Sequence, residues 1–134
     1  GAGGAARTVA AALSGCGLEW VCTNRSPEKA RELAEEAGGS WLPREEVGEA
    51  GPFDLVVQTT SAGMEPDVNG DPLPQYRFGG GELVYELIYS PEETPFLKRA
   101  RRAGCATIGG LHMLRAQARE QFRLFTGGVT PPER

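Results

Sequence analysis

The stretch Gly1-Ala2-Gly3-Gly4-Ala5-Ala6 opens the chain and decides the fold. Its spacing is Gly1-x-Gly3-x-x-Ala6, with a small residue at each of the three fixed positions. In a turn that leads into a helix, the first glycine permits a tight turn and the second lets the backbone approach a pyrophosphate. The small third residue lets the helix pack closely on a sheet. The stretch therefore predicts a helix start whose N–H groups face a dinucleotide, although small residues also serve ordinary helix packing.

Strands and helices alternate along the rest of the chain. Helices are predicted at 5–14, 28–37, a short acidic segment around Glu45, 94–103 and 111–125, and strands at 19–23, 40–42, 53–58, 82–87 and 105–108. The 53–58 strand is apolar and β-branched enough for burial on both faces. Segment 62–81 predicts a surface loop, and the tail around Pro131-Pro132 is expected to be disordered. The alternation predicts an α/β fold with a parallel sheet covered by helices, whose ligands bind at the carboxyl ends of the strands.

Length and composition predict a single domain without a charged partner surface. The 134 residues are 40% hydrophobic, enough for one core of ordinary size. The net charge of −4 comes from interspersed acids and bases, which argues against nucleic acid or an anionic membrane as a partner. No segment has the pattern of a membrane span or a signal peptide, so a cytoplasmic location is expected. Three cysteines without metal-binding or CxxC spacing predict free buried thiols and no metal site.

The end of the second strand indicates which dinucleotide is bound. At this position an acidic residue selects NAD, whereas an arginine accommodates the additional phosphate of NADP. Here the sequence is Asn24-Arg25-Ser26, with Lys29 one helical turn further on. Arg25 can hydrogen-bond a phosphate and Lys29 adds a positive charge, so NADP (NADPH) is the preferred cofactor. The alternative is an arginine and a lysine on a solvated turn.

At this point the chain resembles the shikimate dehydrogenase family over nearly its full length. The motifs that carry the resemblance occur in the family's order: the GAGGAAR opening, the NRS turn at 24–26, TSAGM at 60–64, Tyr89-x-Pro91-x-x-Thr94-Pro95-x-Leu97, and Gly110-x-x-Met113-Leu114-x-x-Gln117. The resemblance implies a Rossmann-like doubly wound parallel sheet. It also implies that residues 1–134 are the NADP-binding domain, truncated at the glycine-rich loop and without the first strand.

The same resemblance implies a role for individual residues. Cofactor binding is implied for Gly1, Ala2, Gly3, Gly4, Ala5, Asn24, Arg25, Ser26, Lys29, Thr60, Ser61, Leu87, Gly110 and Met113, and substrate binding for Tyr89 and Gln117. Met113 and Gln117 are four residues apart and share one face of the last helix. Taken singly, Tyr89 could be a packed strand-end aromatic, Met113 a core residue and Gln117 a solvated one. The only histidine, His112, lies at a position that the family leaves variable, on another face than Gln117.

The chain also departs from the family near the expected cofactor cleft, where the family's Asn-Ala-Thr-Ser is Gln58-Thr59-Thr60-Ser61 and two further positions differ. The family usually has asparagine where this chain has Gln58, aspartate where it has Glu86, and aspartate or asparagine where it has Gly109. The family's catalytic lysine and aspartate lie in an amino-terminal substrate domain, and no residue here matches them. We therefore expect no catalytic residue in this chain, no turnover by the chain alone, and a longer natural polypeptide.

The function that the resemblance implies is NADPH-dependent reduction of 3-dehydroshikimate to shikimate, in the biosynthesis of chorismate and the aromatic amino acids. The partners would be this small-molecule substrate and the missing amino-terminal domain. One alternative is a quinate or aminoshikimate dehydrogenase of the same family. A second alternative, of a different class, is a non-catalytic NADP-binding module.

Overall fold

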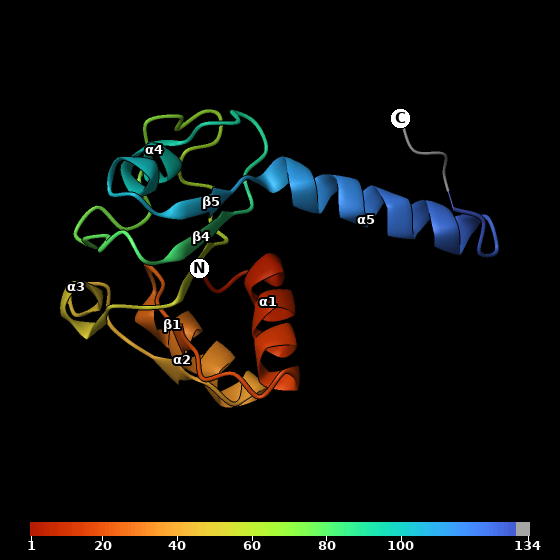
Figure 1. Ribbon diagram of the computed structural model, residues 1–134. Helices are drawn as coiled ribbons and strands as arrows, with labels where there is room; N and C mark the ends of the chain where they lie inside the picture. The colour runs from red at the N-terminus through yellow and green to blue at the C-terminus, as the bar shows by residue number, and fades with distance from the viewer. Residues whose placement is uncertain (131–134) are drawn as a thin grey trace.

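The computed structural model describes residues 1–130 and has an α/β architecture (Figure 1). The helices and strands occur in this order: α1 (Gly4–Gly15), β1 (Val21–Cys22), α2 (Pro27–Ala37), β2 (Ser40–Trp41), α3 (Val47–Ala50), β3 (Leu55–Gln58), β4 (Leu83–Glu86), α4 (Pro95–Arg102), β5 (Ala106–Ile108) and α5 (Gly110–Phe125). The tail around Pro131-Pro132, expected to be disordered, lies outside the described residues.

The strands form two parallel sheets. β1 pairs with β2, and β3, β4 and β5 pair in that order, with Gln58 opposite Glu86 in the register. In a doubly wound sheet of order 3-2-1-4-5-6, β2 and β1 correspond to the third and second strands, and β3 to β5 correspond to the fourth to sixth. Figure 1 shows α4 and α1 on opposite sides of the three-stranded sheet. The predicted Rossmann-like α/β fold is therefore confirmed, with the place of the first strand between β1 and β3.

Each of the two sheets packs against its own hydrophobic cluster. One contains Val84 of β4 and Phe96, Leu97 and Ala100 of α4. The other joins α1, β1 and α2 through Ala6, Ala10, Cys22, Ala30 and Leu33. Trp20 tightens the second cluster, because its indole N–H donates to the Ser14 hydroxyl (2.8 Å) and its ring fills the place that a Cβ on Gly39 would need. The glycine after α2 therefore allows the close approach of β1.

The helix predictions are confirmed except for the third. Ser26 and Thr94 occupy N-cap positions, each followed by proline, although only Thr94 uses its side chain as a cap. The acidic helix expected around Glu45 begins instead at Val47. Glu46 N–H donates to the Pro43 carbonyl (3.1 Å), so the residues before α3 form a turn.

Two other expectations are corrected by burial. The β3 strand is not buried on both faces, since Leu55 is 38% exposed. Its edge opposite β4 has no strand partner among the described residues, and the part of the sheet beside it is open. The three cysteines are free, as predicted, but Cys16 is exposed and only Cys22 and Cys105 are buried.

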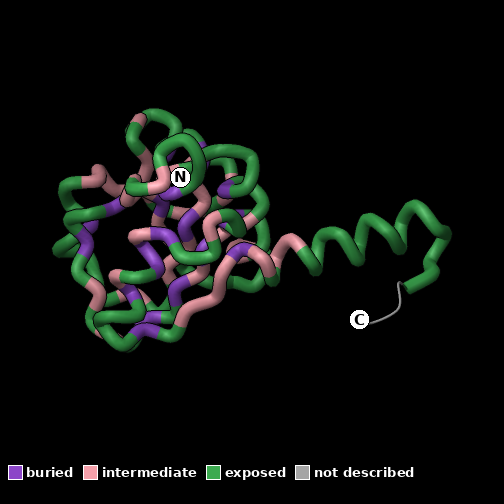
Figure 2. The backbone as a smooth tube through the Cα atoms, turned by 90° about the horizontal axis from the view of Figure 1, so that it is seen from above, coloured by how far each residue is buried: buried purple, intermediate pink, exposed green. Residues whose placement is uncertain are grey.

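The last helix extends away from the rest of the molecule. In Figures 1 and 2, α5 leaves the sheet at its first turn and runs outward with little around it. Within α5 only Gly110 is buried, and Phe125 is 87% exposed. No helix within residues 1–130 is both long and apolar enough to cross a membrane.

Candidate cofactor-binding site

A large cavity of about 1240 Å³ lies between β1 and β3. Val21 and Cys22 line it from β1, and Leu55, Val56 and Val57 line it from β3. Single small-molecule pockets usually hold roughly 300–1,000 Å³, so this cavity is larger than one ligand needs. We call its part between the two strands the slot. At the carboxyl ends of the strands, the cavity is lined by many of the residues predicted to bind the cofactor.

Most of the residues predicted to bind the cofactor line this end of the cavity. Those that line it are Gly1, Ala2, Gly3, Asn24, Arg25, Ser26, Lys29, Thr60 and Ser61. They come from the glycine-rich loop, from the turn after β1 and from the segment after β3. In open parallel sheets, ligands bind at this edge of the sheet because the loops of several strands meet there.

The glycine-rich loop has the geometry of a phosphate cradle. Gly1 lies between the strand ends, and a Cβ there would overlap the Thr59 hydroxyl. Gly3 caps α1 with extended backbone and no side-chain hydrogen bond, and no atom lies within 4 Å of the place of a Cβ on Gly3 or Gly4. There is therefore open space beside the start of α1, where the helix dipole favours an anion.

The turn after β1 supplies positive charge next to this cradle. Arg25 and Lys29 are exposed, and neither makes an ion pair within residues 1–130. Asn24 braces the turn by donating from its side-chain amide to the Ser26 carbonyl (3.2 Å). Two free cations beside a helix N-terminus fit a second phosphate group, such as the one that distinguishes NADP from NAD.

Gln58 holds the segment that carries Thr60 and Ser61. Its side-chain amide is 3% exposed and donates to the carbonyls of Thr60 (3.3 Å) and Ala62 (3.2 Å). Its amide oxygen accepts the Thr60 N–H (2.5 Å). The side chain thus folds the chain after β3 into a fixed turn. The resemblance to the family predicts asparagine at this position, whose side chain is one methylene shorter. The longer Gln58 side chain makes hydrogen bonds with the backbone of Thr60 and Ala62.

Three further predicted residues, Leu87, Tyr89 and Gly110, lie around the start of α5. Gly110 packs so closely on the backbone of Leu87 and Ile88 that a Cβ would overlap it, and Gly110 N–H donates to the Ile88 carbonyl (3.2 Å). A small cavity of about 160 Å³ adjoins this junction. It is lined by Ile88, Tyr89, Glu92, Arg101, Gly109, Gly110, Leu111 and His112. Tyr89 and Gly110 therefore line the same small cavity.

The structure does not bring every predicted residue into a cavity. Met113 is half-buried and Gln117 is exposed on α5, and neither lines either cavity. Gly4 and Ala5 belong to the first turn of α1, and Leu87 lies behind Gly110. The substrate-binding roles of Tyr89 and Gln117 remain predictions.

Sequence reasoning missed two buried carboxyl groups at opposite ends of β4. Glu82 accepts from Tyr76 O–H (3.0 Å) and from the N–H groups of Gly79 and Gly80. Burial opposes its ionisation, but these hydrogen bonds outweigh burial and lower the pKa of Glu82 to about 2. At the other end, burial raises the pKa of Glu86 to about 7. Their positions in an apolar strand gave no sign of the partners that come from distant residues.

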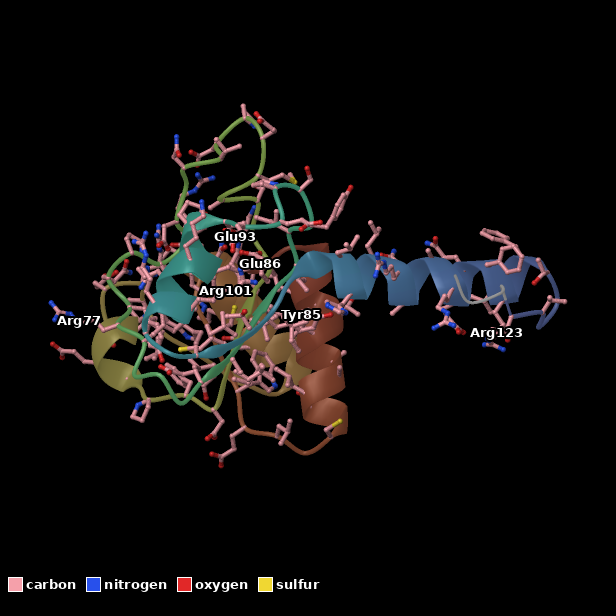
Figure 3. All side chains as sticks on the ribbon, turned by 45° about the horizontal axis from the view of Figure 1, so that its top comes forward. Arg77, Tyr85, Glu86, Glu93, Arg101 and Arg123 are labelled. Carbon is pink, nitrogen blue, oxygen red and sulfur yellow. The ribbon has the colours of Figure 1, made fainter. Side chains whose placement is uncertain are left out.

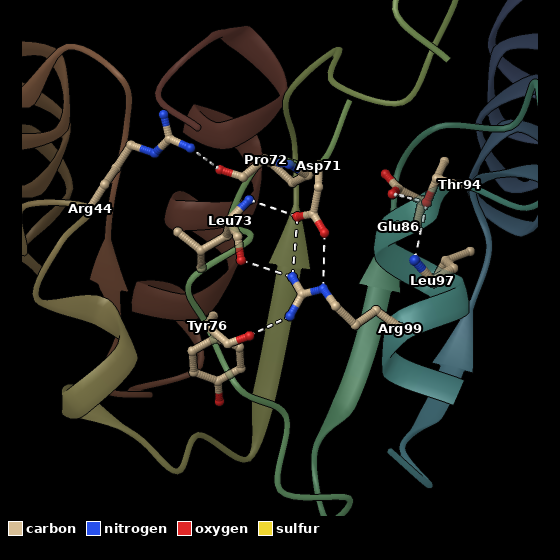
Figure 4. Close-up of polar contacts among 9 residues, drawn as sticks. All are labelled: Arg44, Asp71, Pro72, Leu73, Tyr76, Glu86, Thr94, Leu97 and Arg99. Atoms are coloured by element: carbon tan, nitrogen blue, oxygen red, sulfur yellow. Dashed lines mark hydrogen bonds and ion pairs between the residues drawn. The ribbon is translucent and has the colours of Figure 1, made fainter. Parts of the chain in front are cut away.

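A third missed feature is the arginine that organises the long loop before β4. Arg99 of α4 forms a two-point ion pair with Asp71 (2.9 and 3.1 Å) and donates to the carbonyls of Leu73 and Tyr76 (Figure 4). Arg44 donates to the Pro72 carbonyl in the same loop (2.6 Å). The partners of Arg99 lie 23 to 28 residues away in the sequence, so spacing could not reveal them.

The described residues contain no group of three or more histidine, cysteine, aspartate or glutamate side chains that could hold a metal ion. The fold, the glycine cradle and the free cations beside it define a dinucleotide-binding α/β domain.

Comparison with known proteins identifies the relatives of this domain. The chain is homologous to shikimate dehydrogenases along nearly its whole length. It is 49% identical to the shikimate dehydrogenase (NADP(+)) of Moorella thermoacetica, over 98% of this chain and 48% of that protein. It thus spans about half the length of this curated relative. No family model matches the chain.

Solved structures agree with this relationship. The structure of shikimate 5-dehydrogenase from Thermus thermophilus in complex with NADP(H) and shikimate superposes with a TM-score of 0.85 at 40% identity, over 98% of this chain and 49% of that one. Quinate dehydrogenase from Corynebacterium glutamicum in complex with NAD superposes with a TM-score of 0.83 at 30% identity, with 98% and 49% coverage.

Proposed function

We propose that this chain is the NADP-binding portion of a shikimate dehydrogenase. The whole enzyme would reduce 3-dehydroshikimate to shikimate with NADPH, as a step in the biosynthesis of chorismate and the aromatic amino acids. One observation carries the proposal: Arg25 and Lys29, both without an acidic partner among residues 1–130, lie in one cavity with the glycine cradle at the start of α1. The homology to NADP-dependent shikimate dehydrogenases supports it.

The proposal assigns the chain's residues to binding and orientation. The glycine-rich loop and the first turn of α1 would hold the pyrophosphate, and Arg25 and Lys29 the adenosine phosphate. Thr60, Ser61, Leu87, Gly110 and Met113 would border the nicotinamide. When bound, the cofactor supplies the hydride, while the protein supplies position and electrostatics. Tyr89 and Gln117 would be this domain's contribution to the substrate site.

The rest of the enzyme would come from further polypeptide. We infer that a strand fills the slot, because β1 and β3 each present one edge without a strand partner among the described residues. Unpaired inner edges are costly, and a parallel strand would satisfy them. The catalytic lysine and aspartate belong, in this proposal, to an amino-terminal substrate domain. The cytoplasmic location expected from the sequence stays a prediction.

The likeness to quinate dehydrogenase supports one second candidate, a quinate or aminoshikimate dehydrogenase of the same fold. The structure of that relative contains NAD, whereas the turn after β1 in this chain carries Arg25 and Lys29, neither of which has an acidic partner among residues 1–130. A positive turn favours the phosphate of NADP, so the shikimate dehydrogenase remains the first candidate. A non-catalytic NADP-binding module has no observation in its favour.

Cofactor selection tests the proposal at Arg25. In the complete polypeptide, Arg25→Asp removes a charge-assisted hydrogen bond to the phosphate and adds a repulsive charge. Such bonds contribute about 1.5–3 kcal/mol, so NADPH affinity should fall roughly 10- to 100-fold while NADH affinity holds or rises. Affinities are measured from the change in nicotinamide fluorescence.

Arg31→Asp provides the matched control, because Arg31 lies on α2, the helix that follows Arg25 and carries Lys29, but pairs with Glu35 and does not line the cavity. It should leave both affinities nearly unchanged. Equal affinity of the unmodified protein for NADPH and NADH would contradict the assignment.

A further inference from the structure

Glu86 is a buried carboxyl group that lines neither the large cavity nor the small one. Its side chain is completely buried at the carboxyl end of β4, inside the body of the molecule (Figure 3). Within residues 1–130, no cation forms an ion pair with it. Removing a carboxylate from water without a compensating cation costs stability. A group retained at such a cost is a candidate for function.

The hydrogen bonds of Glu86 join three segments. One carboxyl oxygen accepts from the Ile88 N–H (3.1 Å), and the other accepts from the Thr94 hydroxyl (3.0 Å) (Figure 4). The Thr94 oxygen in turn accepts the Leu97 N–H (3.2 Å) in the first turn of α4. Glu86 therefore fixes the turn that follows β4 relative to the start of α4.

That turn carries the residues on which the proposed site depends. Leu87 N–H donates to the Gln58 carbonyl of β3 (3.1 Å), and the Ile88 carbonyl accepts from Gly110 N–H of α5 (3.2 Å). Tyr89 follows directly. The turn is thus bonded to β3 through Leu87 and to α5 through the Ile88 carbonyl. The hydrogen bond from Ile88 N–H to Glu86 adds an anchor to the buried end of β4.

A change in the charge of Glu86 would change this arrangement. The ionised carboxylate accepts from both donors, whereas a protonated carboxyl must donate from one of its oxygens. A proton on the oxygen that faces Thr94 reverses the direction of that hydrogen bond, and a proton on the other oxygen displaces the Ile88 N–H. Burial raises the pKa of Glu86 to about 7, so both forms exist near neutral pH. The groups that face it are the Gln58 amide of β3, the Thr94 hydroxyl and the N–H groups of Leu87 and Ile88, none of them charged.

We propose that Glu86 is a positioning residue: its ionised carboxylate holds the turn that carries Leu87 and Tyr89, and uptake of a proton by this carboxylate loosens the turn. The consequence for cofactor and substrate binding rests on the proposed function, but the movement of the turn does not.

The test follows position 89 without any ligand. In the complete polypeptide, 4-fluorophenylalanine replaces Tyr89, and its ¹⁹F chemical shift is recorded from about pH 5 to about pH 9. This probe has no ionisable group of its own. His112 lines the same small cavity as Tyr89, together with Arg101 and Glu92, so all spectra are taken in a His112→Gln background.

The fluorine signal should titrate with a midpoint of about pH 7 and should become flat in the Glu86→Gln variant. Glu82→Gln is the matched control, since it neutralises an equally buried carboxyl at the other end of β4 and should preserve the titration. A flat signal with Glu86 present would overturn the proposal even if Glu86→Gln failed to fold. An unchanged titration in Glu86→Gln would overturn it as well. Neither result depends on dehydrogenase activity, so a failure of the proposed function is recognised separately.

Discussion

Gly109 and Gly110 stand side by side at the start of α5 and have different surroundings. A Cβ on Gly110 would overlap the backbone of Leu87 and Ile88, which cannot move aside as a flexible side chain can. A Cβ on Gly109 would have its nearest neighbour 4.0 Å away, at the Glu92 carbonyl. Only the second glycine is required by the packing of α5 on the chain after β4.

Alanine substitution at these two positions gives a matched pair of variants. Gly110→Ala should lower the free energy of unfolding by about 1–3 kcal/mol, the usual cost of overpacking, and should weaken NADPH binding. Gly109→Ala should change neither by more than about 0.5 kcal/mol. Urea denaturation and a fluorescence titration with NADPH measure the two quantities. Equal losses in both variants would show that the close contact of Gly110 is not the cause.

The residue scale also shows which site residues a sequence can reveal. That the glycine-rich loop and Arg25 line one cavity could be predicted, because turn geometry and phosphate charge demand particular residue types at fixed spacing. Their roles in cofactor binding stay predictions. Glu86 was noted only as a departure from the family. Its function in the turn depends on Thr94 and Ile88, and the contact with Thr94 exists only after α4 has packed on β4.

The loop between β3 and β4 is held mainly by one side chain of α4. The Arg99 guanidinium pairs with Asp71, donates to two loop carbonyls and lies over the Phe78 ring, 4.9 Å from its centroid. Arg101 lies two residues further on and makes only exposed contacts with Glu93 and Thr107. The two arginines therefore differ in the degree to which their partners are buried.

Replacing Arg99 should loosen the loop. Arg99→Met should reduce the free energy of unfolding by about 2–3 kcal/mol, because it leaves a partly buried carboxylate and two carbonyls without their donor. Arg101→Met should cost less than about 1 kcal/mol, as is usual for an exposed ion pair. Chemical denaturation measures both, and hydrogen exchange of residues 70–78 localises the effect. Equal protection of this loop in the two variants would contradict the role of Arg99.

Element boundaries were predicted with uneven success, for physical reasons. Helices α2 and α4 follow the prediction closely because proline after an N-cap residue fixes their starts. All five strands are shorter than predicted, including β4, which has a strand partner on each edge. The apolar pattern extends past the residues that make ladder bonds, because it records burial and not pairing.

At the scale of the whole molecule, the two carboxyl groups of β4 give opposite dependences of stability on pH. Glu82 has a lowered pKa in the folded state, so its contribution is present above its ordinary pKa near 4.5 and is lost as the pH falls toward 2. Glu86 has a raised pKa, so its contribution is full below 4.5 and is lost as the pH rises through 7.

Neutral replacements should show this difference. Glu86→Gln should be more stable than the unmodified protein at about pH 8, by on the order of 3 kcal/mol, and similar to it at about pH 4. Glu82→Gln should be destabilised at neutral pH and less so near pH 3. Urea denaturation across this range measures both effects. A Glu86→Gln variant that is less stable at pH 8 than at pH 4, relative to the unmodified protein, would contradict the raised pKa of Glu86.

The whole enzyme activity that we propose depends on more than this domain. The slot between β1 and β3, the extended α5 and the match to about half of each relative all fit a cofactor half that works with a second half. In the proposal, the substrate lies mainly against the other domain, so the choice between shikimate and quinate depends on that domain. Turnover by the complete polypeptide is therefore the decisive observation.

The most direct measurement is the initial rate of nicotinamide reduction by the complete polypeptide, with shikimate or quinate as substrate and NADP⁺ or NAD⁺ as cofactor. We predict that shikimate with NADP⁺ gives the highest kcat/KM, that NAD⁺ lowers it at least roughly tenfold through loss of the phosphate contacts of Arg25 and Lys29, and that the 134-residue chain alone gives no turnover. No turnover of shikimate by the complete polypeptide, or a preference for quinate with NAD⁺, would contradict the account.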